Sequence, residues 1–265
     1  MKSMKKWLRF VFLILLVSLS GINAAETGKP VYHVLFIGNS YTYYHSMPQM
    51  FKAISEHAFS KNRVETKFVG GGGATLKKHW EVGQALVEIK TGHWDYVVLQ
   101  EQSMLGSQDL TDPDSPKQFF KYARLFDLQI KKSGAKTVFF MTWSRRLLKN
   151  QQKYLTDAYL TIAKELGSKV APVGMVWERI RENPKIELYM DDGSHPSIAG
   201  SFLAALTLSA VIFHAVPEKV PGDLYGYEIL RGGTLAAHKS RLCHLPYEAV
   251  QTIRDTVAHI LSQRR

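Results

Sequence analysis

Short apolar runs alternate with longer amphipathic segments along most of the chain. The runs are rich in Val, Phe and Tyr, and several are apolar at nearly every position, as in strands covered on both faces. They cover residues 31–37, 65–69, 95–100, 136–143 and 168–173. Because strand and helix alternate five times, the pattern predicts an α/β protein: a three-layer αβα arrangement with a parallel sheet of about five strands.

The segments between and after these runs have helical spacing. Ser46 with Gln49 three residues later has the spacing of a capping box, which predicts a helix N-terminus at Ser46. The segment 195–216 is apolar almost all round, and its Ser, Gly and Thr residues favour a buried helix over a membrane span. Helices are predicted at 46–59, 74–90, 115–134, 153–167, 195–216 and 247–261.

The segment 216–245 carries Gly and Pro without clear periodicity. Its sequence is compatible with a loop that shapes a cleft and with a simple surface crossing.

The N-terminus has the layout of a secretory signal peptide. Lys2, Lys5, Lys6 and Arg9 precede an apolar run, and Ala24-Ala25 follow it. The apolar run is shorter than the roughly 20 residues of a spanning helix, which disfavours an uncleaved anchor. We therefore expect residues 1–24 to be a signal peptide that is cleaved after Ala24 or Ala25. The mature protein is expected to be exported, either periplasmic or secreted, and to have one functional domain over residues 31–265.

Charge and cysteine content restrict the possible partners. Without the four basic residues of the signal peptide, the formal net charge falls from +11 to +7, and the surplus is spread along the chain. Nucleic acid is therefore not expected as a partner, nor is stable membrane insertion after cleavage. Cys243 is the only cysteine, so no internal disulfide forms. We expect its side chain to pack as a small buried hydrophobic group.

Polar and glycine-rich stretches follow the first three predicted strands. Ser40 ends "FIGNS", four glycines at 70–73 follow the second strand, and "QEQS" at 100–103 ends the third. The carboxyl ends of parallel strands share one edge of a sheet, so the three stretches are expected to meet there. Each has a simpler interpretation as a turn, and the glycines could also be a phosphate-binding loop.

A late loop, "YMDDGSHPSIAG" at 189–200, supplies an acid and a base. A serine hydroxyl becomes a good nucleophile when a histidine takes its proton, and a carboxylate holds that histidine in the right tautomer. Asp192 and His195 stand three residues apart in this loop, which also fits a helix cap.

In this order, the motifs resemble those of the SGNH (GDSL-like) hydrolase superfamily over residues 31–214. "GNS" at 38–40, "GAT" at 73–75 and "DGSH" at 192–195 are similar to family motifs, and "QEQS" stands where the family has Gly-x-Asn-Asp. The resemblance implies a flavodoxin-like sheet and a Ser-His-Asp mechanism without metal or other cofactor. It also implies Ser40 as nucleophile, His195 as base and Asp192 as its orienting carboxylate, with an oxyanion hole formed by Ser40, Gly73 and Gln102.

The sequence thus predicts an exported esterase that hydrolyses small acyl esters, with carbohydrate O-acetyl groups as the first choice of substrate. Gln100, an alternative oxyanion donor, and the aromatic residues Tyr41 and Trp143 are predicted near the substrate. A lipase or lysophospholipase of the same fold is the enzymatic alternative. A non-catalytic carbohydrate-binding protein is the alternative from another class. The oligomeric state is left open.

Overall fold

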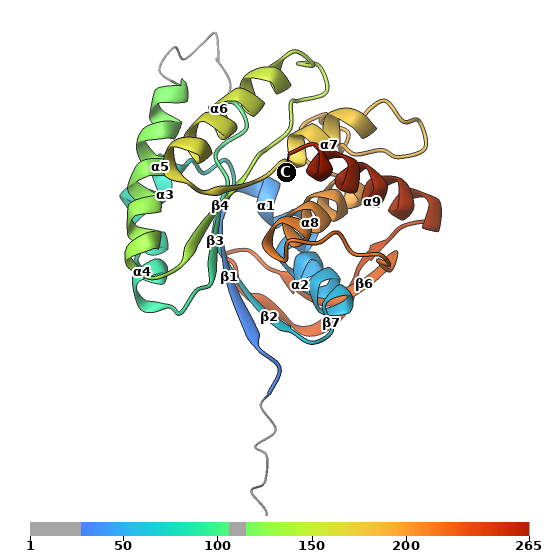
Figure 1. Ribbon diagram of the computed structural model, residues 1–265, viewed down its shortest axis with the longest axis horizontal. Coiled ribbons are helices and arrows are strands. Elements are labelled where there is room, and N and C mark those ends of the chain that lie inside the picture. The colour runs from blue at the N-terminus through green and yellow to red at the C-terminus, as the bar shows by residue number, and fades with distance from the viewer. Residues whose placement is uncertain (1–27, 106–114, 265) are drawn as a thin grey trace, which may run out of the picture.

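A five-stranded parallel sheet forms the middle layer of the protein (Figure 1). The computed structural model describes residues 28–105 and 115–264, and the signal peptide predicted for residues 1–24 lies outside them. The strand order is β2-β1-β3-β4-β5, which confirms the predicted three-layer αβα class. The strands are β1 (Val31–Gly38), β2 (Arg63–Gly70), β3 (Tyr96–Leu99), β4 (Lys136–Phe140) and β5 (Lys169–Ala171).

Helices cover both faces of this sheet (Figure 1). Along β1, Val34 and Phe36 enter one apolar core while Leu35 and Ile37 enter the other, which explains why the strand is apolar at successive positions. The helices packed on the Leu35 side are α3 (Leu76–Val82), α4 (Gln84–Thr91), α5 (Ser115–Lys132) and α6 (Gln151–Leu166). Those packed on the Val34 side are α2 (Met47–Ala58), α7 (Val173–Ile180), α8 (Ile198–Ile212) and α9 (Tyr247–Ser262).

Helix α8 is the buried helix expected from its composition, and nearly every residue in it is inaccessible. In the part of the chain that the structure describes, no helix is both long and apolar enough to cross a membrane. Cys243 is also buried as expected, and burial raises the pKa of its thiol to about 12.

Two local predictions about helices need correction. Helix α2 begins directly after Ser46, as predicted, but without a capping box. Ser46 has a left-handed backbone (φ 56°) and caps no helix amide; its Oγ accepts a hydrogen bond from the amide of Ile229 instead. The segment 74–90 is two helices, because Gly83 takes a φ of 81° that a continuous helix does not allow.

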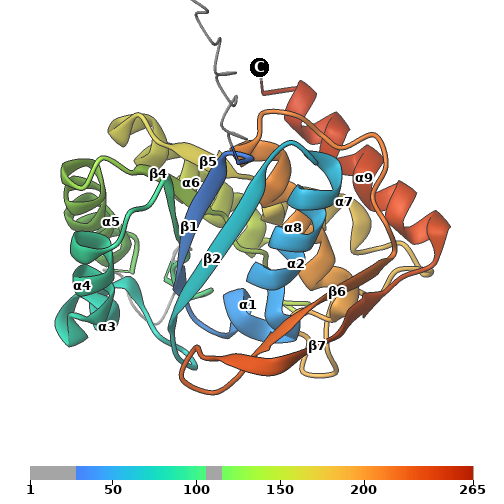
Figure 2. The same ribbon diagram turned by 90° about the horizontal axis from the view of Figure 1, so that it is seen from below.

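Two elements were not predicted at all. Helix α7 follows β5 directly, and an antiparallel hairpin of β6 (Asp223–Ile229) and β7 (Leu235–His244) occupies most of 216–245. Figure 2 shows the hairpin running beside α1 (Ser40–Tyr43) and α2, with its turn near the carboxyl end of β2. The alternation "LYGYEI" is a strand signal, and the adjacent glycines Gly232 and Gly233 both take positive φ in the connecting turn.

Candidate active site

Ser40 lies at the carboxyl end of β1, on the first residue of the one-turn helix α1. Asn39 caps this helix, since its Oδ1 accepts a hydrogen bond from the amide of Tyr41 at 3.0 Å. The backbone N–H of Asn39 and the hydroxyl of Thr42 both donate to Gln100 Oε1, at 2.8 and 2.9 Å. The turn that presents Ser40 is therefore held from behind by the end of β3.

The structure brings Ser40, His195 and Asp192 together. Ser40 Oγ lies 2.9 Å from His195 Nε2, and the other ring nitrogen of His195 forms a short hydrogen bond with Asp192 Oδ2. Asp192 Oδ1 accepts from the amides of Ser194 and His195, each at 2.9 Å. Although partial burial raises the pKa of Asp192, these hydrogen bonds outweigh it and hold that pKa at about 2.

The loop that carries His195 is fixed from several sides. Gly193 takes a φ of 64°, and its carbonyl accepts from the amide of Arg146 at 2.8 Å. Ser194 accepts from Trp143 Nε1 through its carbonyl at 3.1 Å, and its hydroxyl pairs with the Tyr41 hydroxyl at 2.7 Å. These bonds come from the ends of β1 and β4, so the sheet itself sets the position of the base.

Tyrosine rings enclose the imidazole of His195. The ring of Tyr44 stacks on it with centroids 4.5 Å apart, and Tyr41 meets it edge-on at 5.7 Å. No sequence motif pointed to Tyr44, since aromatic residues close to a nucleophile along the chain give no information on which ring faces the base.

The glycine segment lies beside the Ser40 turn. Asn39 Nδ2 donates to the carbonyl of Ala74 at 3.0 Å, which ties the end of this segment to the start of α1. Among the described residues, the backbone N–H groups of Ser40 and Gly73 donate no hydrogen bond. Both amides therefore remain available for an acceptor supplied by a substrate.

Gln102 occupies the turn after β3. Its side-chain Oε1 accepts from the amide of Met104 at 2.6 Å, so the side chain folds back over its own turn. Its Nε2 has no hydrogen-bond partner among the described residues, which leaves this donor available.

Three residues predicted near the substrate are buried in the protein. Gln100 is fully inaccessible, and its amide nitrogen donates to the carbonyl of Glu101, so it is neither a substrate contact nor an oxyanion donor. Trp143 is also fully buried, stacked between Tyr41 at 4.4 Å and Trp177 at 4.0 Å. Tyr41 is only 4% exposed. The prediction was wrong for Gln100 and Trp143, because sequence position at a sheet edge does not reveal which side chains point inward. For Tyr41, which contacts Ser194 and His195, it stays a prediction.

Glu101 was not singled out by the sequence, yet it joins two of the loops. It is fully buried, and its Oε1 accepts from the amides of Gln102 at 2.7 Å and Leu76 at 3.1 Å. Its Oε2 has no partner among the described residues. Burial raises the pKa of Glu101 to about 7, against the opposing effect of the two amide hydrogen bonds.

This pKa predicts a pH-dependent stability. The folded-state pKa of about 7 lies above the ordinary glutamate pKa of 4.5, so folding favours the protonated acid. The stabilisation from Glu101 is complete below about pH 4.5 and is lost as the pH rises through 7. In Glu101→Gln the charge is absent, so from pH 5 to pH 8 the free energy of unfolding of the variant should gain about 2–3 kcal/mol relative to wild type. Urea unfolding at several pH values measures this.

The exposed Glu81 of α3 provides the control. Glu81→Gln should follow the wild-type pH dependence throughout this range, because it leaves the buried Glu101 carboxyl group in place. Parallel curves for Glu101→Gln and wild type would contradict the raised pKa.

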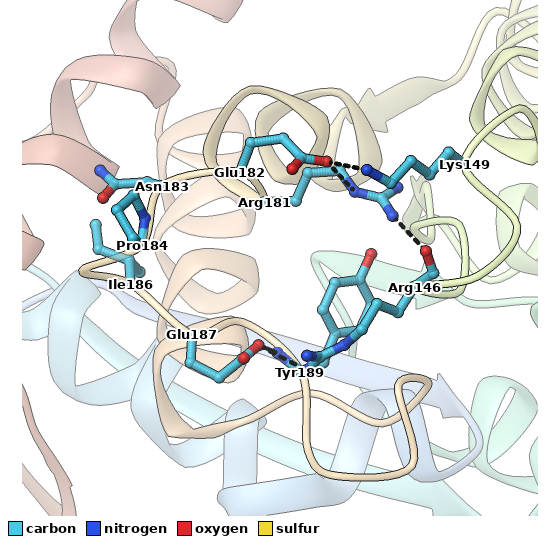
Figure 3. A pocket seen from close by; sticks show the side chains of 9 residues that line it. All are labelled: Arg146, Lys149, Arg181, Glu182, Asn183, Pro184, Ile186, Glu187 and Tyr189. Carbon is cyan, nitrogen blue, oxygen red and sulfur yellow. Dashed lines mark hydrogen bonds and ion pairs between the residues drawn. The ribbon is translucent and has the colours of Figure 1, made fainter.

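A pocket of about 270 Å³ lies behind the His195 loop and is lined by basic and acidic residues (Figure 3). Arg146 pairs with Glu187 at 2.9 Å, and Lys149 pairs with Glu182 at 2.7 Å. Arg181 donates to the carbonyl of Arg146 at 2.9 Å. The cations of this pocket already have protein partners, so we assign the pocket a structural role. Its ion pairs hold the segment before Asp192 in place.

The described residues contain no candidate metal site. Residues 28–105 and 115–264 contain no group of three or more His, Cys, Asp or Glu side chains placed to hold a metal ion.

No protein-family model and no curated protein matches the chain, whereas solved structures do. A protein from Slackia heliotrinireducens, described as a candidate SGNH hydrolase, superposes with a TM-score of 0.56 at 28% identity, covering 69% of this chain and 99% of its own. An acetyl xylan esterase superposes with a TM-score of 0.53 at 13% identity, covering 68% of this chain and 99% of its own. A lipase/acylhydrolase from Enterococcus faecalis superposes with a TM-score of 0.53 at 16% identity, covering 71% of this chain and 100% of its own. The fold and the neighbour at 28% identity, a candidate SGNH hydrolase, bear out the resemblance of this chain to the SGNH (GDSL-like) hydrolase superfamily.

Proposed function

We propose that the protein is an exported serine esterase that removes small acyl groups, above all O-acetyl groups, from carbohydrates. The observation that carries the proposal is the hydrogen-bonded series from Asp192 through His195 to Ser40. The structural neighbours support a carboxylic ester hydrolase, and one of them is an acetyl xylan esterase. Export rests on the N-terminal sequence, and with it the division into a signal peptide (1–24) and a functional domain (31–265).

In the first half of the proposed reaction, His195 Nε2 takes the proton of the Ser40 hydroxyl as Ser40 Oγ attacks the ester carbonyl carbon. Asp192 keeps the other ring proton on Nδ1, so that Nε2 faces Ser40 as an acceptor, and stabilises the imidazolium that forms. The tetrahedral intermediate collapses when His195 returns the proton to the leaving alcohol, and the acetyl group remains on Ser40.

The negative charge on the carbonyl oxygen needs donors during this step. We assign the backbone amides of Ser40 and Gly73 to this role, because neither donates a hydrogen bond within the described residues. Gln102 Nε2 is the candidate third donor. One such donor contributes roughly 3 kcal/mol to lowering the barrier. Water then attacks the acetyl-enzyme with His195 again as base, which releases acetate and restores Ser40.

Two alternatives remain distinct from this proposal. A lipase or lysophospholipase needs a long apolar groove beside Ser40, whereas the grooves near the candidate site carry charged side chains. A carbohydrate-binding protein without turnover gives no reason to align Asp192, His195 and Ser40 in hydrogen-bonding order.

A fluorophosphonate probe tests the mechanism directly. We expect the intact mass of the wild-type protein to rise by one probe adduct, since the Ser40 alkoxide displaces fluoride from phosphorus. Ser40→Ala and His195→Ala should stay unlabelled. The control Ser60→Ala removes an exposed serine and should be labelled like wild type. A folded wild-type protein without adduct would contradict the esterase and favour the binding protein. The same spectrum, recorded on exported protein, reports whether the chain starts after Ala24 or Ala25.

A further inference from the structure

An open groove of about 330 Å³ lies between the segment that follows Ser40 and the hairpin β6–β7. One wall consists of Tyr43, Tyr44 and His45, and the other is contributed by Glu228 and Ile229 of β6 with Arg241 and Leu242 of β7. Figure 2 shows the hairpin passing beside α1 and α2, with its turn near the carboxyl end of β2. The candidate active site and this groove therefore share the short α1 segment.

Tyr44 connects the groove to the candidate base. Its ring lies nearly parallel to the His195 imidazole, with centroids 4.5 Å apart and an angle of 20° between the planes. His45 also reaches the His195 loop, since its Nε2 lies 3.1 Å from the carbonyl oxygen of Pro196. In an esterase the base hands its proton to the leaving alcohol, so the alcohol part of the substrate must lie on the His195 side.

The backbone of this wall is strained and is held by the hairpin. His45 and Ser46 both have positive φ, 50° and 56°, a backbone conformation that is strained at non-glycine residues. The amide of Ile229 donates to Ser46 Oγ at 2.8 Å, which links the strained turn to β6. Such strain is found where the surrounding structure enforces a functional arrangement.

The side chains in the groove suit a neutral sugar. Tyr43 and Tyr44 are half-buried, their rings stack on each other with centroids 5.6 Å apart, and both line the groove. The exposed part of this ring pair gives the C–H groups of a pyranose an apolar surface with a hydroxyl group at its rim.

Glu228 and Arg241 are exposed and stand on neighbouring strands. Glu228 accepts from the Ser240 hydroxyl at 2.8 Å, and Arg241 lies 3.8 Å from Asp223. Both side chains nevertheless stay exposed, so the second carboxylate oxygen and the other guanidinium N–H groups can bind sugar hydroxyls. Their opposite charges favour neither an anionic ligand nor an acyl chain, which would require a continuous apolar lining.

We propose that this groove binds a neutral sugar unit of the alcohol part of the substrate, next to the ester that Ser40 attacks. The inference rests on the proposed esterase function and adds the place where the carbohydrate binds. It also gives the hairpin a role, since β6 and β7 supply the polar half of the groove.

The test compares a substrate with sugar and one without it. Acetate release from acetylated xylo-oligosaccharides and acetylated manno-oligosaccharides is measured beside hydrolysis of 4-nitrophenyl acetate. For Arg241→Ala and Glu228→Gln we expect kcat/KM on an oligosaccharide to fall about tenfold, mainly through KM, with 4-nitrophenyl acetate unchanged. Arg231→Ala, in the turn of the same hairpin and outside the groove, should change neither reaction.

The outcomes separate this inference from the esterase proposal. Equal losses on both substrates, or no change on either oligosaccharide, would overturn the sugar site while leaving the esterase intact. If wild type hydrolyses nothing and the probe does not label Ser40, the esterase fails. Calorimetric titration with the unacetylated oligosaccharides then decides the groove alone: binding that weakens in Arg241→Ala supports it, and no binding to the folded wild type rejects it.

Discussion

Asp192→Asn is expected to lower kcat for hydrolysis of 4-nitrophenyl acetate by about 10⁴-fold while leaving the protein folded. The amide oxygen of Asn can still accept from the amides of Ser194 and His195, as Asp192 Oδ1 does. Its NH₂ group, however, faces His195 Nδ1 and donates to it. The imidazole then carries its proton on Nε2, which points at Ser40 as a donor and cannot take the serine proton.

The matched control is Asp191→Asn, which removes the same charge one residue earlier. Asp191 is exposed, and we expect its variant to keep wild-type kcat within about twofold, because surface charges remote from the reacting atoms contribute little. Steady-state kinetics and the thermal unfolding temperature are measured for both. A loss below tenfold in folded Asp192→Asn would remove Asp192 from the proposed mechanism.

Gly200→Ala is expected to lower the stability of the protein strongly. Gly200 lies in the first turn of α8, where an added Cβ would stand 2.4 Å from the carbonyl oxygen of Leu188 and 2.5 Å from the ring of Trp177. One neighbour is backbone and the other is fully buried, so neither can move away easily. We expect the free energy of unfolding to fall by about 3 kcal/mol, at the upper end of the usual cost of overpacking.

Helix propensity makes the opposite prediction, since Ala stabilises a helix interior by about 1 kcal/mol relative to Gly. Urea unfolding therefore decides between packing and propensity by the sign of the change. Gly71→Ala is the control, because its Cβ would have no neighbour within 4 Å and its φ is not positive. An unchanged or increased stability of Gly200→Ala would contradict the close approach of α8 to Leu188.

The same substitution should also affect catalysis. Leu188 lies two residues before Met190, whose amide donates to the carbonyl of His195 at 2.9 Å. A displacement of Leu188 therefore reaches the loop that carries Asp192 and His195. Near-attack geometry is sensitive to shifts of about 1 Å, which gives a reason to expect slower turnover even in the folded fraction.

The sequence by itself determined the central sheet, and the reason is local. A strand buried on both faces must be apolar at successive positions, so Val34 to Ile37 are recognisable without any partner. The parallel arrangement then brings the ends of the strands to one edge, which is why Ser40, the glycines at 70–73 and "QEQS" at 100–103 could be expected to meet. Asp192 and His195 needed only their own short loop to be recognised as a pair.

Only the tertiary structure decided which side chains at that edge face the site. Gln100 and Trp143 follow strands just as Gln102 does, yet both are buried, because each is surrounded by residues distant in sequence. The stacking of Tyr44 on His195 joins residues about 150 positions apart. The hairpin β6–β7 was missed because its strands are mostly exposed and depend on α2 and on Ser46 for their position. Local patterns record burial and turn chemistry, whereas the lining of a groove depends on contacts that form only when the chain has folded.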